Sequence, residues 1–211
     1  MRTDVHSHIL YGVDDGAKNR KESLLMLDAA RECGLERIVA TPHYIRAWKD
    51  RQEARRVFAE LAPEAGKRGI SLVLGSEFSI REFESDRIGF IKNELCFEDS
   101  NALLLELGKY TTLEEAQDAI YPLQRHDISI IIAHPERNVY FQKERDYFKE
   151  FLFMGCTLQL SAECLLLPAV NPRRRAAKRM LSAKAYRFIA SDAHSAEDYK
   201  TFAILKQKYR F

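Results

Sequence analysis

The sequence lacks any long uninterrupted run of apolar residues. Within its 211 residues, no stretch approaches the ~20 apolar residues that a membrane-spanning helix needs. The first residues, Met1-Arg2-Thr3-Asp4, contain no apolar segment of the kind found in a secretory signal. We therefore expect a cytoplasmic protein with no membrane partner.

Cysteine is scarce, and charge of one sign is not in excess. The four cysteines lie far apart and form no Cys-x-x-Cys pair, which predicts buried packing thiols rather than disulfides. The 33 Lys and Arg residues against 31 Asp and Glu leave a formal charge of only +2, so we expect no nucleic-acid partner. A hydrophobic content of 46% excludes a wholly disordered chain.

Short apolar runs alternate with amphipathic segments along the chain. The runs lie at residues 4–8, 37–41, 70–75, 102–107, 128–133, 157–160 and 187–190. A helix-capping residue stands three positions before an acid in three places: Asn19 and Glu22, Thr112 and Glu115, Ser195 and Asp198. This pattern predicts an α/β fold of parallel strands joined by helices. About seven such units in one domain, residues 1–211, favour a small or distorted (β/α) barrel, with a loop or short helical insertion at 81–99.

Histidine or acid stands at the end of six of the seven apolar runs. The residues concerned are His6, His8, His43, Glu77, Glu106, His134, Asp192 and His194. The C-terminal strand ends of a (β/α) barrel meet at one mouth, so we expect these side chains to converge. One such residue alone is often an ordinary hydrogen-bonded polar side chain, but six strand ends together predict a site.

The chemistry of this set favours metal ions. Nitrogen and oxygen donors without thiolate point to manganese, iron, zinc or cobalt. With Asp15 in the first strand-to-helix loop, the donors outnumber the ligands of one four-coordinate ion. We therefore predict two or three divalent ions, bridged by carboxylates such as Glu77 and Glu106. Without cations, such clustered carboxylates would repel one another.

Several motifs resemble those of a known superfamily. Asp4-Val5-His6-Ser7-His8, Gly12-Val13-Asp14-Asp15-Gly16 and Ala40-Thr41-Pro42-His43 are similar to the start of the PHP (polymerase and histidinol phosphatase) superfamily. Together with Gly75-Ser76-Glu77, Leu105-Glu106, Ala133-His134-Pro135-Glu136-Arg137 and Ser191-Asp192-Ala193-His194, they are most similar to the bacterial capsule-biosynthesis tyrosine phosphatases of the CpsB/CapC/YwqE type. The resemblance runs in consistent order from residue 4 to about residue 195.

The resemblance implies a distorted, PHP-like (β/α) barrel with a site for three metal ions, usually manganese or iron. It implies hydrolysis of phosphotyrosine on the tail of a bacterial capsule or exopolysaccharide tyrosine kinase. The implied metal ligands are His6, His8, Asp15, His43, Glu77, Glu106, His134, Asp192 and His194. Arg137 matches an arginine beside the phosphate, so we expect it to be catalytic; the alternative is a salt bridge to Glu136. The expected nucleophile is a metal-bound hydroxide.

Other interpretations stay open from the sequence. The substrate could instead be histidinol phosphate, a nucleotide or, as in TatD-like nucleases, DNA, and a non-catalytic metal-binding regulator is a further alternative. The sequence leaves open whether subunits assemble into an oligomer. We expect Asp4 to accept a hydrogen bond behind the histidines and His126 to be a solvent or capping residue. Arg46 and Arg81 either line the mouth or are ordinary surface charges.

Overall fold

Parallel strands alternate with helices through the chain, as the sequence predicts. The computed structural model describes residues 2–44 and 51–209. Within these residues the chain forms nine strands: β1 (Thr3–Ser7), β2 (Arg37–Ala40), β3 (His43–Tyr44), β4 (Ser71–Leu74), β5 (Glu77–Ser79), β6 (Ala102–Glu106), β7 (Ser129–Ala133), β8 (Thr157–Ser161) and β9 (Tyr186–Ala190). Every strand pairing is parallel.

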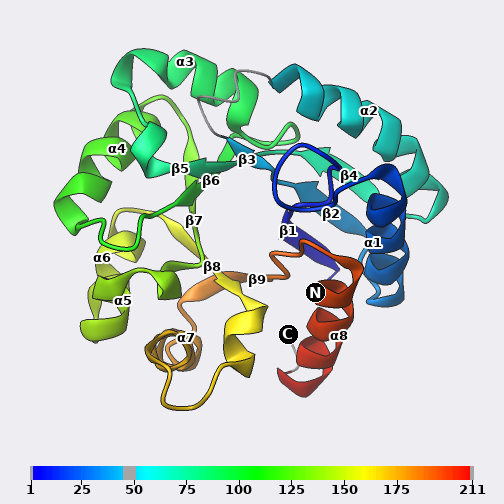
Figure 1. Ribbon diagram of the computed structural model, residues 1–211. Helices are drawn as coiled ribbons and strands as arrows, with labels where there is room; N and C mark the ends of the chain where they lie inside the picture. Colours follow the sequence, from blue (N-terminus) through cyan, green and yellow to red (C-terminus); the bar gives the residue numbers. More distant parts are fainter. Residues whose placement is uncertain (1, 45–50, 210–211) are drawn as a thin grey trace.

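Helices connect the strands and cover them on the outside (Figure 1). They are α1 (Arg20–Glu32), α2 (Arg51–Lys67), α3 (Ile88–Phe90), α4 (Leu113–Arg125), α5 (Val139–Lys143), α6 (Tyr147–Phe153), α7 (Pro172–Ser182) and α8 (Ala196–Tyr209). The predicted caps are confirmed: Asn19 and Thr112 accept from the backbone N–H groups of Glu22 and Glu115, and Ser195 Oγ accepts from the backbone N–H of Asp198 at 3.4 Å.

Short helical turns fill the loops after several strands. They are η2 (Ile80–Glu82), η3 (Ser85–Arg87), η4 (Ile91–Leu95), η5 (Pro135–Arg137) and η6 (Ala162–Leu166). Three of them, with α3, make up the helical insertion expected at residues 81–99.

The strands do not form the expected single barrel of about seven strands. They make two sheets with the orders β1-β2-β4 and β3-β5-β6-β7-β8-β9, arranged around a common centre (Figure 1). The predicted runs at 37–41 and 70–75 form β2 and β4, and two short strands that were not predicted, β3 and β5, follow them after Thr41-Pro42 and after Gly75-Ser76. Pro42 has no N–H to donate to a ladder, and Gly75 is pressed against Phe97, so that a Cβ there would lie 2.5 Å from the ring.

A bulge in β1 aims the first histidines toward the centre. Asp4 pairs with Ile38 and Ser7 pairs with Ala40, so two residues of β1, Val5 and His6, oppose the single Val39 of β2. Val5 and Val39 belong to the apolar cluster between the strands. In a regular strand Asp4 and His6 would point to the same face, but the extra residue in the bulge places them on opposite faces.

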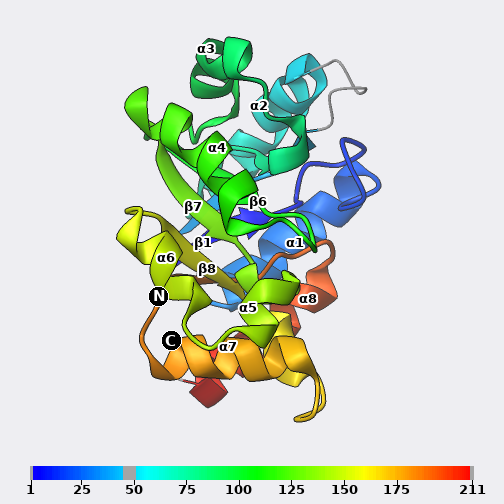
Figure 2. The ribbon, with the colours of Figure 1, turned by 90° about the vertical axis from the view of Figure 1, so that its left-hand side faces the viewer.

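Apolar packing fills both the centre and the space under the helices. Two larger apolar clusters lie between the strands and the helices. A smaller cluster, which includes Leu104 and Ile131, is formed mainly by strand residues. Figure 2 shows α4 and α6 on one side of the molecule, with α7 below them. The cysteines are free and largely buried, as predicted. None of the helices in the described ranges combines the length and apolar character needed to cross a bilayer.

Candidate metal centre

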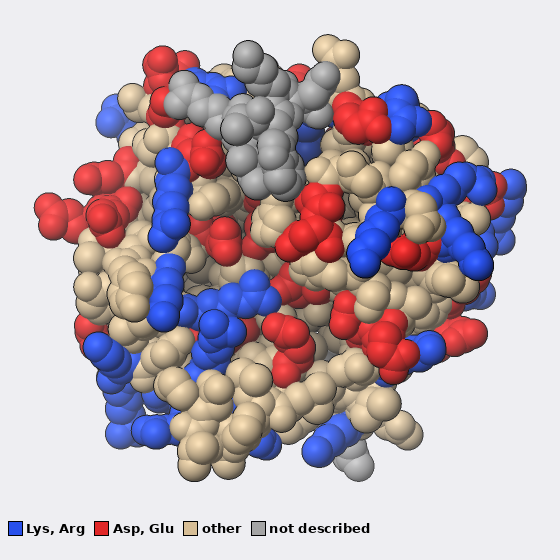
Figure 3. All heavy atoms as spheres, in the orientation of Figure 1, with Lys and Arg blue, Asp and Glu red and all other residues tan. Residues whose placement is uncertain are grey.

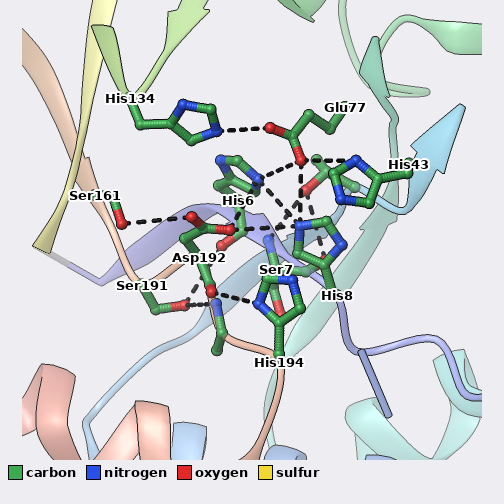
Figure 4. A network of polar contacts seen from close by, with 12 residues as sticks. His6, Ser7, His8, His43, Glu77, His134, Ser161, Ser191, Asp192 and His194 are labelled. Carbon is green, nitrogen blue, oxygen red and sulfur yellow. Dashed lines mark hydrogen bonds and ion pairs between the residues drawn. The ribbon is translucent and has the colours of Figure 1, made fainter. Parts of the chain in front are cut away.

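All nine predicted ligand positions lie close together. Figure 4 shows the histidines of this cluster with Glu77 and Asp192. Four overlapping groups have potential ligand atoms within 4.8 Å of one another: His8, Asp15, His43 and His194; His6, His8 and Glu77; His6, His134 and Asp192; Glu77, Glu106 and His134. These residues come from six strand ends and one loop, between sequence positions 6 and 194. The overlap of the groups allows several ions to share ligands.

His6, His8 and Glu77 have the spacing of neighbouring metal ligands. The two Nε2 atoms lie 3.2 Å apart, and Glu77 Oε2 lies 3.1 Å from His6 Nε2 and 3.3 Å from His8 Nε2. Ligands ~2.1 Å from one ion lie about 3.0 Å apart at octahedral angles and about 3.4 Å apart at tetrahedral angles. The donor positions therefore fit a single cation shared by the three side chains.

Buried acceptors hold both histidines in the tautomer that a metal requires. Gln159 Oε1 accepts from the backbone N–H of His134 at 3.2 Å, so the atom is the amide oxygen, and it lies 3.1 Å from His6 Nδ1. His6 Nδ1 must therefore carry the proton, and Nε2 keeps its lone pair. Asp14 Oδ2 lies 2.7 Å from His8 Nδ1 and has the same effect.

Sequence analysis missed Gln159 and Asp14. Gln159 is a polar residue between two leucines in the middle of β8, and this was the signal that the sequence offered. It is fully buried. Asp14 is adjacent to the predicted ligand Asp15 in the same loop, and its side chain also accepts from the backbone N–H groups of Gly16 and His43.

The electrostatics of the centre couples its histidines to its carboxylates. Burial disfavours the charged form of His6, but the carboxylates of Asp192 and Glu77 outweigh it and raise the histidine's pKa. Burial likewise disfavours ionised Glu77, but His6 and hydrogen bonds from the surrounding histidines hold its pKa well below the usual range. The opposite shifts show that each side chain is charged more readily because of the other, and bound metal ions would supply the same compensation.

A second group lies closer to the surface. Asp15 Oδ1 is 3.6 Å from His43 Nε2 and 3.5 Å from His194 Nε2, and the rings of His8 and His194 stack with centroids 4.1 Å apart. His194 Nδ1 is 2.9 Å from the carbonyl oxygen of Asp192, so its Nε2 is free to bind a metal.

The third group joins Glu106 to the buried residues. His134 Nε2 lies 2.7 Å from Glu77 Oε1, the carboxylate oxygen that does not face His6. Burial and the nearby charge of Glu77 raise the pKa of Glu106. One carboxylate oxygen of Glu77 therefore faces His6 and His8, and the other faces His134. A carboxylate in this position could be shared by two ligand groups.

Unusual backbone conformations support the site. His134 has φ +29° and Asp192 has φ +53°, values that non-glycine residues adopt at an energetic cost. Gly16 packs against His8 so closely that a Cβ would lie 2.1 Å from the His8 carbonyl oxygen. A glycine is therefore required where the loop of Asp14 and Asp15 covers His8.

Arg137 lies beside the centre and does not pair with Glu136. Its guanidinium forms an ion pair with Asp192 Oδ2 and lies 3.3 Å from Glu163 Oε1. Glu136 is fully buried and accepts from the backbone N–H of Ser161 at 3.0 Å and from the Tyr186 hydroxyl at 3.2 Å. Because Asp192 Oδ1 faces His6 at 3.2 Å, one carboxylate links the arginine to the histidine cluster.

Asp4 accepts hydrogen bonds behind the histidines, as expected, but not from an imidazole. Its carboxylate accepts from the backbone N–H and the hydroxyl of Ser191 and from the backbone N–H of His6 at 3.4 Å. The bulge in β1 explains the difference, because Asp4 and His6 no longer share a face. Gln159 and Asp14 accept from the imidazoles instead.

The remaining expectations concern residues farther from the centre. His126 is confirmed as a capping residue, since its Nδ1 lies 2.9 Å from the carbonyl oxygen of Pro122 at the end of α4. Arg81 is exposed and packs on Gly108. Arg46 lies outside the described residues. Acidic and basic side chains are mixed over much of the face seen in Figure 3, and Lys and Arg gather at its lower left.

Comparison with known proteins relates this arrangement to a family. Residues 2–204 match the family described as capsular polysaccharide synthesis, CpsB/CapC. The chain is 34% identical to CapC of Staphylococcus aureus over 91% of this chain and 76% of CapC. It is 29% identical to the tyrosine-protein phosphatase YwqE of Bacillus subtilis over 92% of this chain and 78% of YwqE.

The fold comparison agrees. A crystal structure from work on YwqE of Bacillus subtilis and CpsB of Streptococcus pneumoniae, described as unique metal-dependent tyrosine phosphatases, superposes with a TM-score of 0.79 and 25% identity. The superposition covers 98% of this chain and 87% of the other. The sequence match extends over nearly the whole chain and includes every residue of the candidate metal centre, so this chain belongs to the CpsB/CapC family of capsular polysaccharide synthesis proteins.

Proposed function

We propose that this protein is a metal-dependent protein-tyrosine phosphatase. Its substrate would be phosphotyrosine on the tail of a bacterial capsule or exopolysaccharide tyrosine kinase, and residues 1–211 would act as one PHP-type phosphatase domain. The main observation in support of the proposal is the overlap of four potential ligand groups around His6, His8 and Glu77. The activity of the relatives named above supports the choice of phosphotyrosine.

The residues fit two or three divalent ions, with manganese as the preferred ion and iron, zinc or cobalt as alternatives. We propose as ligands His6, His8, Asp15, His43, Glu77, Glu106, His134, Asp192 and His194. The ions would supply an activated water as nucleophile and neutralise charge on the phosphoryl oxygens. Three divalent ions would outweigh the four carboxylates, so the loaded centre would attract a dianionic phosphate.

The protein's own side chains would orient the reaction. Gln159 and Asp14 hold the Nε2 lone pairs of His6 and His8 toward the ligand cluster. Arg137, fixed by Asp192 at the edge of this cluster, can present a planar pair of N–H donors to two phosphate oxygens. A phenolate leaving group with a pKa near ~10 depends less on a general acid than an alkoxide does.

The decisive experiment combines metal analysis with hydrolysis of a phosphotyrosine peptide. We expect two or three ions per chain and hydrolysis that a chelator abolishes and Mn²⁺ restores. Replacing the proposed ligand by His8→Asn should remove both metal and activity, whereas His126→Asn, away from the centre, should change neither. One ion or none per chain, or faster cleavage of histidinol phosphate or a DNA oligonucleotide, would contradict the proposal.

A further inference from the structure

A pocket of about 290 Å³ lies next to the proposed phosphatase centre and contains none of its ligands. Part of its wall follows β5, with Ile80, Arg81 and Phe83. The opposite wall consists of Tyr110 and Thr111, before α4, and Glu115 and Asp118 on that helix. We call this space the flanking pocket.

The flanking pocket is attached to the segment that carries Arg137. Asn138, the next residue, donates side-chain hydrogen bonds of 2.9 Å to the carbonyl oxygens of Gly108 and Thr111. The backbone N–H of Val139 donates to the carbonyl oxygen of Lys109 at 2.9 Å. The loop that forms one wall is therefore held in place by the neighbours of the proposed phosphate-binding arginine.

The pocket also lies within reach of the metal centre. Tyr110 follows the proposed ligand Glu106 by four residues, so their Cα atoms are at most ~14 Å apart even in a fully extended chain. Arg81 is packed over Gly108, where a Cβ would lie 3.2 Å from the guanidinium Nε. A substrate peptide whose phosphotyrosine reaches the centre would pass this pocket within a few residues.

The lining of the pocket combines apolar surface, aromatic rings and carboxylates. Glu115 and Asp118 are exposed and stand three residues apart on one face of α4. Glu115 accepts from the backbone N–H of Thr112 through Oε2 only. Among the residues in the described ranges, Asp118 has no hydrogen-bond or ion-pair partner. Arg81 is the cation of the lining and packs on Gly108, and the Lys109 ammonium lies 5.2 Å from the centroid of the Tyr110 ring. Asp118 is the carboxylate of the lining that neither of these cations pairs with.

We propose that the flanking pocket binds a lysine or arginine side chain of the substrate, a few residues from its phosphotyrosine. This inference rests on the proposed phosphatase function. The aliphatic stem of such a side chain would pack on Ile80 and Phe83, and its charged end would reach Asp118. The ring of Phe83 adds a face that attracts a cation. The pocket would thus select among phosphotyrosine sequences without taking part in the chemistry.

The test uses phosphotyrosine peptides that differ at one position. Lysine, norleucine or glutamate is placed in turn at each of the four positions before and after the phosphotyrosine. Norleucine keeps the apolar stem but lacks the charge. We expect one position where lysine lowers KM about three- to ten-fold relative to norleucine, with kcat little changed, as for an exposed ion pair with an aromatic neighbour.

Matched variants identify the carboxylate responsible. In Asp118→Asn the KM values of the lysine and norleucine peptides should become about equal. Hydrolysis of para-nitrophenyl phosphate should stay at the wild-type rate. Asp127→Asn, the same change at an exposed position outside the pocket, should keep the wild-type ratio of the two KM values.

Two kinds of result would overturn the inference, and they can be told apart. Equal KM values for lysine and norleucine at every position, a preference for glutamate, or a lysine preference that survives in Asp118→Asn would overturn the flanking pocket alone. No hydrolysis of any phosphotyrosine peptide by the metal-loaded protein would overturn the proposed function as well.

Discussion

Gln159→Leu should weaken metal binding although Gln159 is not itself a proposed ligand. In the native protein its Oε1 accepts from His6 Nδ1 and from the backbone N–H of His134, both buried. Leucine has a similar volume but no acceptor, so His6 can turn or change its tautomer and no longer present Nε2. Removing an equivalent partner behind a metal-binding histidine typically costs 10–100-fold in metal affinity, equal to about 1.4–2.7 kcal/mol.

The same substitution should also destabilise the metal-free fold. Two buried donors lose their acceptor, at about 1–3 kcal/mol each, and the added apolar contacts of leucine offset part of this. Gln159→Glu keeps an acceptor at this position and should restore most of the metal affinity. Gln124→Leu is the matched control, because Gln124 donates a 2.7 Å hydrogen bond to the Met154 carbonyl oxygen far from the proposed ligands.

Calorimetric titration of the metal-free proteins with Mn²⁺ measures the affinity, and thermal unfolding in chelator measures the stability. We expect weaker binding in Gln159→Leu and near-native binding in Gln159→Glu and Gln124→Leu. If Gln159→Leu bound Mn²⁺ as tightly as the wild type, the argument that this amide sets the His6 tautomer would be refuted. A loss of stability shared by both leucine variants would not account for a loss of affinity in only one.

Three further predictions test other parts of the site. Arg137→Lys should keep the metal content but lower kcat/KM for a phosphotyrosine peptide roughly 10- to 100-fold, because lysine lacks the planar pair of donors and a hydrogen bond to a charged group contributes about 1.5–3 kcal/mol; unchanged kinetics would remove this arginine from the mechanism. Gly16→Ala should lower the free energy of unfolding by about 1–3 kcal/mol, as overpacking does, because the new Cβ overlaps the carbonyl oxygen of His8; an unchanged melting temperature would contradict the observed contact. In the metal-free protein, burial opposes charge on His6, but neighbouring carboxylates raise its pKa above the ordinary 6.5. This stabilisation is complete below the unfolded-state pKa and is lost as the pH rises through the folded-state value, so the melting temperature in chelator should fall with rising pH above neutrality. The Mn²⁺-loaded protein should lack this decline, and the same decline with Mn²⁺ would argue against metal binding at His6.

Much of the site follows from local sequence. His6, His8, His134 and Asp192 stand directly after or within short apolar runs, and parallel strands bring their C-terminal ends to one side. Residue type and position within a strand were therefore sufficient to predict that these donors would gather. The caps at Asn19 and Thr112 were predictable for the same reason, since both partners lie within one turn.

The breaks in the sheet were not predictable in this way. Pro42 marks the break between β2 and β3 in the sequence, but nothing in the sequence shows that a second strand follows it. The break between β4 and β5 coincides with the packing of Gly75 against Phe97, a contact that exists only in the folded protein. The bulge in β1 likewise depends on the register with β2. A one-residue change of register moves a side chain to the other face, which is why Asp4 and His6 separate.

The sequence by itself determined which residue types are available as ligands, where most of the strands and longer helices lie, and the family to which the chain belongs. Only the tertiary structure decided the partners of those ligands: Gln159 behind His6, Asp14 behind His8 and Asp192 beside Arg137. Periodicity and capping are set by neighbours along the chain. The hydrogen bond between His6 and Gln159, in contrast, joins residues 153 positions apart, and such a contact exists only once the strands have packed around their common centre.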